Sequence, residues 1–190
     1  MRVLGISGSL RRDSFNSGLL RAAAEVLPSG AELELFEGLK AIPPYDADDD
    51  VDSGPDAVRA LREALTDADA VLVATPEYNA SIPGVLKNAL DWASRPHATN
   101  PLRGKPVAVV GASTGMFGAV WAQADTRKVL STIGARVLDR ELPVAEADER
   151  FDADGRLNDP EMQELLAEIV AELVGAAEAR AAGLAARAAA

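Results

Sequence analysis

The sequence predicts an α/β protein: a doubly wound, five-stranded parallel sheet in the order 2-1-3-4-5, with helices on both faces. Two observations support this fold. Five short apolar runs alternate with segments whose apolar residues recur at helical spacing. The run at 70–74 is continuously apolar, as expected of a strand that helices cover on both faces. The 190 residues suffice for one domain with a sizeable core, which we expect at 1–174, followed by an Ala-rich tail at 175–190.

The first predicted strand, 2–6, leads into a loop rich in hydroxyl and guanidinium groups, and a helix is predicted over 15–27. The first N–H groups of a helix lack intrahelical partners and its dipole favours negative charge, so a phosphate group fits here. The candidate ligands are Ser9, Arg11, Ser14, Asn16 and Ser17. An ordinary N-cap without a ligand would explain the same residues equally well. Neither the GxGxxG nor the GxxxxGK[ST] pattern is present, which disfavours dinucleotide binding of that kind and ATP hydrolysis.

The second strand, 31–36, is followed by an acidic loop at 38–52 and a helix that Ser53 can cap, with Val58, Leu61 and Leu65 on its buried side. The acidic loop lacks the Gly and Glu of a calcium-binding loop at the required spacing, and the segment 151–159 lacks the terminal Glu. We therefore interpret the first as a solvated loop and the second as a turn that precedes an N-capped helix. No metal site is expected.

The third strand, 69–75, ends in a polar turn before a helix that continues to Trp92, with Pro83 suited to its first turn. Pro76 stiffens this turn, so the amides of Glu77, Tyr78 and Asn79 can be held toward a planar ligand. A surface turn with a buried tyrosine is the alternative.

The fourth strand, 106–111, ends in a third loop of small residues, where Gly115 and Gly118 would let the backbone approach a flat ring. A helix at 119–133, a fifth strand at 135–138 and a helix containing Met162 to Val174 complete the fold. We expect the Ala-rich tail beyond Gly175 to protrude, fray or contact a neighbour. Because strand ends of a parallel sheet share one edge, the three loops predict a crevice.

The amino-acid composition and net charge exclude several classes of function. The absence of cysteine excludes disulfides, thiol nucleophiles and thiolate metal sites. A net charge of −11 disfavours nonspecific nucleic-acid binding. No apolar run is long enough for a membrane span and the N-terminus has no leader-like segment, so we expect a cytoplasmic protein. The single histidine, His97, is expected at the surface near the crevice rather than in catalysis.

The segments 8–16, 76–79 and 83–92, with sequences GSLRRDSFN, PEYN and PGVLKNALDW, resemble the NADPH-dependent FMN reductase family. This family includes quinone, chromate and azo reductases with a flavodoxin-like fold, and the resemblance spans about residues 2–174. It implies a bound FMN with the five residues of the first loop around its phosphate. It places Pro76, Glu77, Tyr78 and Asn79 along the isoalloxazine, and Ser113, Gly115 and Gly118 in a third flavin loop. Members often carry paired glycines where this chain has Gly118-Ala119.

The activity that the resemblance implies is ping-pong, two-electron reduction of quinones, free flavin or similar acceptors by NAD(P)H, with the chemistry at flavin N5 and no catalytic side chain. Relatives of this kind form homodimers or homotetramers in which the helix around Leu86 to Trp92 meets a partner subunit. An alternative is a flavodoxin-like one-electron carrier for redox proteins, which the acidic composition would suit and Arg11 in the phosphate loop disfavours. A flavin-binding or nucleotide-binding regulatory module ranks last.

Overall fold

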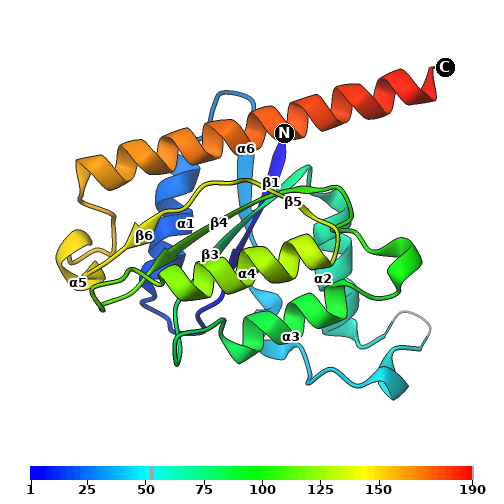
Figure 1. Ribbon diagram of the computed structural model, residues 1–190, viewed down its shortest axis with the longest axis horizontal. Helices are drawn as coiled ribbons and strands as arrows, with labels where there is room; N and C mark the ends of the chain where they lie inside the picture. Colours follow the sequence, from blue (N-terminus) through cyan, green and yellow to red (C-terminus); the bar gives the residue numbers. More distant parts are fainter. Residues whose placement is uncertain (52–53, 190) are drawn as a thin grey trace.

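The computed structural model describes residues 1–51 and 54–189 and places a parallel sheet between two layers of helices (Figure 1). The sheet order β2-β1-β3-β4-β5 confirms the predicted order, and its neighbouring strands run parallel. The strands are β1 (Arg2–Ser7), β2 (Glu32–Leu35), β3 (Ala70–Thr75), β4 (Pro106–Ala112), β5 (Arg136–Val137) and β6 (Pro143–Val144). The α-helices are α1 (Phe15–Glu25), α2 (Asp56–Asp67), α3 (Gly84–Ala93), α4 (Val120–Thr132), α5 (Ala147–Arg150) and α6 (Pro160–Ala188). Short 3₁₀ helices lie at η1 (Gly38–Ala41), η2 (Ala47–Asp49) and η3 (His97–Thr99).

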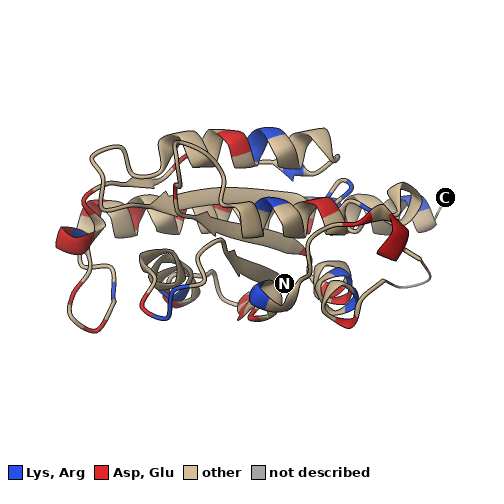
Figure 2. Ribbon diagram, turned by 90° about the horizontal axis from the view of Figure 1, so that it is seen from below, with Lys and Arg blue, Asp and Glu red and all other residues tan. Residues whose placement is uncertain are grey.

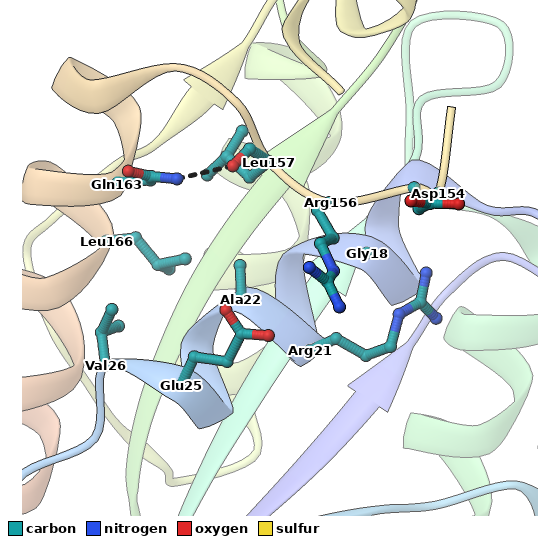
Figure 3. Close-up of a pocket in the computed structure, with 11 residues that line it drawn as sticks. Gly18, Arg21, Ala22, Glu25, Val26, Asp154, Arg156, Leu157, Gln163 and Leu166 are labelled. Carbon is teal, nitrogen blue, oxygen red and sulfur yellow. Dashed lines mark hydrogen bonds between the residues drawn. The ribbon is translucent and has the colours of Figure 1, made fainter. Parts of the chain in front are cut away.

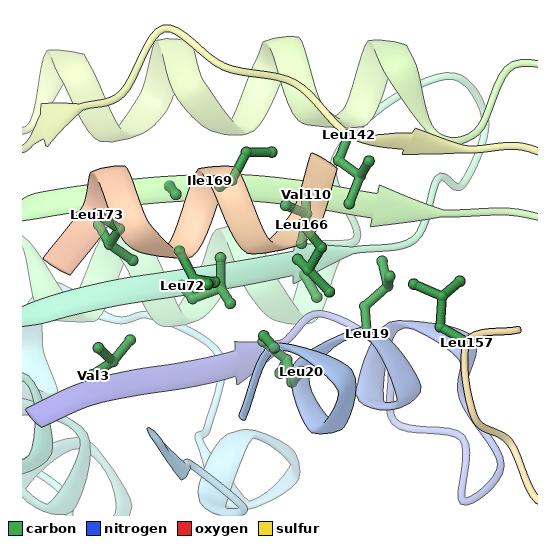
Figure 4. Close-up of a cluster of buried hydrophobic side chains, with 14 of the residues drawn as sticks. Val3, Leu19, Leu20, Leu72, Val110, Leu142, Leu157, Leu166, Ile169 and Leu173 are labelled. Atoms are coloured by element: carbon green, nitrogen blue, oxygen red, sulfur yellow. The ribbon is translucent and has the colours of Figure 1, made fainter. Parts of the chain in front are cut away.

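Two hydrophobic clusters cover the two faces of the sheet. On one face, α1 and α6 contribute Leu19, Leu20 and Ile169 against Leu72 and Val110 of the central strands (Figure 4). On the other face, α2, α3 and α4 pack on the alternate residues of the same strands. Every residue of β3 and β4 is buried, which confirms that the apolar run at 70–74 is covered on both sides. At about 1.5–3 kcal/mol for each large apolar side chain removed from water, these clusters hold the strands, and the loops that follow them, in fixed positions.

The fifth strand differs from the prediction. It is divided into β5 and β6, and both pieces pair with the same side of β4: β5 opposite Pro106 and Val107, β6 opposite Gly111 and Ala112. The intervening segment is held by Arg127, which pairs with Asp139 and Glu141. The short apolar run at 135–138 marked only the first piece, because two-residue strands have too few positions to show a period. The second piece, β6, reaches the end of the sheet where the polar loops lie.

Two helix termini differ slightly from the sequence expectation. Helix α1 ends at Glu25 rather than at 27. Helix α2 begins at Asp56 with Pro55 in the N-cap position, while Ser53, the expected cap, lies outside the described residues.

Lys105 caps the carboxyl end of α2: its ammonium group donates to the carbonyl oxygens of Leu65 and Ala68. Burial lowers the pKa of Lys105 to about 8; Arg180 acts in the same direction, whereas Asp69 and Asp67 raise the pKa.

Helix α6 extends without interruption from Pro160 into the Ala-rich segment and ends at Ala188. Asp159 caps it by accepting the N–H of Met162 at 3.1 Å, which confirms the N-capped helix expected there. Ala177 is still buried against the body of the protein, whereas Leu184 is exposed. Figure 1 shows the C-terminal turns of α6 extending past the sheet. The tail is thus a continuation of the last helix.

The charged positions lie mainly on helices and loops around the sheet (Figure 2). Several of the aspartates have local structural partners: Asp46 caps η2, Asp50 pairs with Arg62 at 2.9 Å, and Asp152 accepts the N–H groups of two residues in its own turn. Within 1–51 and 54–189, no group of three or more His, Cys, Asp or Glu side chains is arranged to hold a metal ion. None of the helices described there is long and apolar enough to cross a membrane.

Candidate functional site

Three polar loops follow three neighbouring strands and lie together at the carboxyl edge of the sheet. The register pairs Ser7 with Ala74 and Thr75 with Gly111, so β1, β3 and β4 end at nearly the same level. The loop after β1 is also joined to β3 by the Gly8 N–H, which donates to the Ala74 carbonyl oxygen at 2.8 Å. The predicted juxtaposition of the loops is therefore present, and ligands of open α/β sheets bind at this edge.

The first loop offers donors to an anion at the start of α1. Ser14 is the N-cap, and its hydroxyl accepts the Asn16 N–H at 3.2 Å. The N–H groups of Phe15 and Ser17 have no acceptor among the residues that the structure describes. The Ser17 hydroxyl donates to the Ser7 hydroxyl at 3.1 Å. Two open amides beside hydroxyl groups at a helix N-terminus form a suitable phosphate cradle.

The other candidates of this loop lie around the same turn. Ser9 is nearly buried, and its hydroxyl accepts the Arg11 N–H at 3.4 Å. Arg11 itself is exposed, and its guanidinium makes one long contact, 3.4 Å, to the Asp13 carbonyl oxygen. This guanidinium is therefore held only weakly, which leaves it able to turn toward a phosphate oxygen.

Asn16, a predicted phosphate ligand, makes side-chain contacts within the protein. Its side chain is only 3% exposed and makes two 3.0 Å hydrogen bonds to Ala112: Nδ2 donates to the carbonyl oxygen, and Oδ1 accepts the N–H. The side-chain amide therefore ties the start of α1 to the end of β4. Only the backbone N–H of Asn16 lies in the phosphate loop, and Ser14 already accepts it. The sequence could not show this tie, because the two residues are 96 positions apart.

The second loop is a tight turn. Tyr78 and Ser81 exchange two backbone hydrogen bonds of 3.2 Å, and Asn79 and Ala80 between them have φ angles of 53° and 57°. Two successive positive φ angles are the signature of a type I′ turn, which is strained for alanine. Pro76 is buried, whereas Tyr78 is 49% exposed, so the alternative of a buried tyrosine is wrong. Strain at a functional loop is consistent with a turn held in place for binding.

The side chain of Glu77 has hydrogen-bond partners within the protein, whereas its backbone N–H has none among the described residues. Its N–H, like that of Asn79, has no acceptor among the described residues. Its carboxylate accepts the N–H groups of Trp121 and Ala122, at 3.0 and 3.2 Å, in the first turn of α4. The amide is available to a ligand, and the carboxylate is committed to the protein.

In the third loop, Ser113 and Gly115 lie at the surface, with the Ser113 hydroxyl accepting the Gly115 N–H at 3.1 Å. Gly118 is buried with φ 55°, and a Cβ there would lie 2.4 Å from the carbonyl carbon of Pro143. The buried amide of Gln123 donates to the Gly118 carbonyl oxygen and accepts the N–H of Leu142. Packing against β6 thus suffices to require glycine at 118, and its contact with a ring stays a prediction.

Exposed apolar side chains concentrate around these loops. Of the seven large apolar residues that are exposed in the described chain, five belong to the three loops or the first turn of α4. They are Leu10, Tyr78, Met116, Phe117 and Trp121. The rings of Phe117 and Trp121 meet edge to face, with centroids 4.8 Å apart. A clustered apolar rim beside open amides suits a flat ligand that has a polar edge.

A cavity of about 780 Å³ lies elsewhere, between α1, the segment 154–157 and α6 (Figure 3). Arg21, Glu25 and Arg156 line it together with Asp154, so two cations are matched by two carboxylates. No aromatic side chain is among its lining residues, all of which are described. A smaller cavity of about 280 Å³ is lined by Arg11 and Ser14 of the first loop and by the segment 152–155. We place the candidate site at the three loops, because the open amides and the apolar rim are there.

Comparisons with known proteins identify the family of the chain. The sequence model of NADPH-dependent FMN reductases matches residues 1–149. The chain belongs to the NADPH-dependent FMN reductase family. It is 46% identical to an NAD(P)H-dependent FMN reductase of Pseudomonas aeruginosa over 167 residues, which are 87% of this chain and 89% of the relative. It is 40% identical to a 2-hydroxy-1,4-benzoquinone reductase of a Burkholderia species, with 83% of this chain and 85% of the relative covered.

Among solved structures, this FMN reductase family member is similar to FerB, a flavoenzyme NAD(P)H:(acceptor) oxidoreductase of Paracoccus denitrificans. The TM-score is 0.83 and the identity 36%, with 93% of this chain and 97% of FerB covered. As a family member the protein is an enzyme with FMN as its cofactor and NAD(P)H as its reductant. The residues present fit FMN, because open backbone amides lie at the start of α1 and in the second loop, and exposed aromatic side chains lie beside them.

The sequence did not predict three contacts that shape the candidate site: the Glu77 carboxylate on α4, the Gln123 bridge and the Phe117–Trp121 pair. One signal was available. Helix α4 starts after Ala119, a residue with no capping side chain, and its first turn holds no acidic residue, so a cap from elsewhere in the chain could have been sought.

Proposed function

We propose that the three loops bind FMN and that the protein uses it to pass two electrons from NAD(P)H to a quinone. The phosphate would lie at the start of α1, against the open N–H groups of Phe15 and Ser17, with the hydroxyls of Ser9 and Ser14 beside it. Arg11 would turn from Asp13 to the phosphate and neutralise part of its charge.

The isoalloxazine would extend from this cradle along the second and third loops. The N–H groups of Glu77 and Asn79 can donate to acceptor atoms on the edge of the ring, and Ser113 and Gly115 line the opposite side. When bound, FMN accepts a hydride from NAD(P)H and returns two electrons to an acceptor. The chain contributes binding, orientation and hydrogen-bond donors that stabilise negative charge on the ring edge.

A quinone is the acceptor that the site and the relatives favour. The exposed rim of Tyr78, Phe117 and Trp121 offers aromatic contact area to a flat, apolar substrate. The Burkholderia relative bears the name of a benzoquinone reductase. Because nicotinamide and quinone would use the same exposed ring face, they would bind in turn.

We also propose that the protein forms a homodimer or homotetramer. Leu86 and Trp92 of α3 are fully buried within the chain, so only the remaining side of that helix is available to a partner. The apolar rim around the loops adds contact area beside it. Light scattering at micromolar concentration should give at least twice the 19.8 kDa of the chain, and a mass of one chain would contradict this proposal.

The observation that carries the proposed function is the set of open backbone amides at the strand ends in a member of this reductase family. The test is steady-state kinetics of the FMN-loaded protein with NADPH or NADH and a benzoquinone. Parallel double-reciprocal lines, together with anaerobic bleaching of the flavin by NAD(P)H and its recovery on quinone addition, are expected. A flavin that NAD(P)H does not bleach would refute the enzyme assignment and favour the electron-carrier alternative.

A further inference from the structure

The carboxylate of Glu77 joins the second loop to a helix that has no cap of its own. The N-cap of α4 is Ala119, which offers no side-chain acceptor, and the first turn contains no acidic residue. Glu77 accepts the Trp121 N–H at 3.0 Å and the Ala122 N–H at 3.2 Å from a loop more than forty positions earlier in the chain. A carboxylate on two N–H groups at the positive end of a helix dipole is a strong form of capping.

A second contact ties the far end of the same turn to the same helix. The Ser81 hydroxyl donates to the carboxylate of Asp125, one turn further along α4, at 2.6 Å. The strained pair Asn79 and Ala80 lies between these two attachments. The turn is therefore fixed on α4 at both ends, which is what a conformation with two positive φ angles needs in order to persist.

We infer that Glu77 is a positioning residue for FMN binding: its carboxylate holds the turn 77–81 and the start of α4 in register, and only its backbone faces the flavin. This inference rests on the proposed function. Without the carboxylate, the N–H groups of Trp121 and Ala122 lose their acceptor, and the turn loses one of its two attachments. The open amides of Glu77 and Asn79 would then move relative to the phosphate loop, and Trp121 would move relative to Phe117.

The test compares FMN dissociation constants of apoprotein variants, measured by the quenching of flavin fluorescence. Glu77→Ala should raise the dissociation constant at least tenfold, whereas Glu77→Gln, which keeps an oxygen acceptor of the same shape, should stay within about threefold of the parent protein. Asp69→Ala is the matched control. Asp69 is also partly buried and its carboxylate also accepts a backbone N–H, that of Arg2 at 2.8 Å, but at the opposite edge of the sheet. Its loss should lower stability without changing FMN affinity.

A second readout reports the charge of the Glu77 carboxylate, which a change in stability alone would not alter. Glu77→Gln removes a negative charge beside the third loop, so the midpoint potential of the bound flavin should become more positive, because the reduced ring carries negative charge. The inference is overturned if Glu77→Ala binds FMN as tightly as the parent, or if Asp69→Ala loses as much affinity as Glu77→Ala. A parent protein that binds no FMN would instead refute the proposed function.

Discussion

Replacing Asn16 tests whether hydrogen bonds within the protein hold the first and third loops in place for FMN, or whether the bound ligand does so. The side-chain amide makes two 3.0 Å bonds to the backbone of Ala112, and both residues are almost fully buried. Asn16→Ala would leave one N–H and one carbonyl group without partners. At about 1–3 kcal/mol for each of these two unsatisfied buried groups, the free energy of unfolding should fall by about 2–6 kcal/mol.

The chain offers a matched control for this change. Asn100 is also buried, and its side-chain amide also bridges two backbone groups: Nδ2 donates to the Ile133 carbonyl oxygen at 2.7 Å, and Oδ1 accepts the Leu102 N–H at 2.9 Å. This bridge lies before the start of β4, away from the three loops. Asn100→Ala should therefore lower stability by a similar amount and leave FMN affinity intact.

The assay combines urea unfolding of the apoprotein with FMN titration of each variant. Asn16→Ala should weaken FMN binding about tenfold or more, because the phosphate loop and the third loop are no longer held together. Asn16→Asp should weaken FMN binding more than its loss of stability suggests. It keeps one hydrogen bond to Ala112 but adds a negative charge beside the phosphate cradle. Equal FMN affinity in the Asn16 and Asn100 variants would refute the bracing role. A stability loss below about 0.5 kcal/mol in Asn16→Ala would refute the hydrogen-bond argument itself.

Three further changes probe other parts of the structure. Gly118→Ala should destabilise the protein by more than about 2 kcal/mol in urea unfolding, because φ is 55° and the new Cβ would stand 2.4 Å from Pro143; unchanged stability would show that β6 can move away. Between pH 8 and pH 10.5 the folded protein binds fewer protons at Lys105 than the unfolded chain, so stability should rise by up to about 3 kcal/mol over this range. Lys105→Met should abolish that rise, and an identical pH dependence in both proteins would contradict the lowered pKa. Arg11→Ala should weaken FMN retention far more than it slows flavin reduction by NAD(P)H in protein that is still loaded; equal retention by dialysis would argue against its phosphate role.

The order of the sheet and the place of the candidate site were predicted from short-range patterns in the sequence. The apolar run at 70–74 fixed β3 as a central strand, and the right-handed connections of alternating strands and helices leave few other orders. Once the strands were assigned, the polar loops had to share the carboxyl edge. The strand assignments and the shared edge of the loops depend only on residues that are close in sequence, so they can be predicted without knowledge of tertiary contacts.

The roles of individual side chains were harder to predict, because they depend on partners distant in sequence. Asn16 and Glu77 occur in the right loops, yet their side chains bond to Ala112 and to the start of α4. The division of the fifth strand had the same cause: β6 is defined by its pairing with β4. Loop composition thus indicates where a ligand binds, whereas the long-range hydrogen bonds decide which polar groups are left to bind it.

Direct titration of the apoprotein with FMN tests the central claim, that backbone amides at three adjacent strand ends hold a phosphorylated flavin. We expect saturation at one FMN per chain, with riboflavin, which lacks the phosphate, binding about a hundredfold more weakly or worse. Riboflavin binding as tight as that of FMN would contradict the phosphate cradle, and the absence of any flavin binding would contradict the whole assignment.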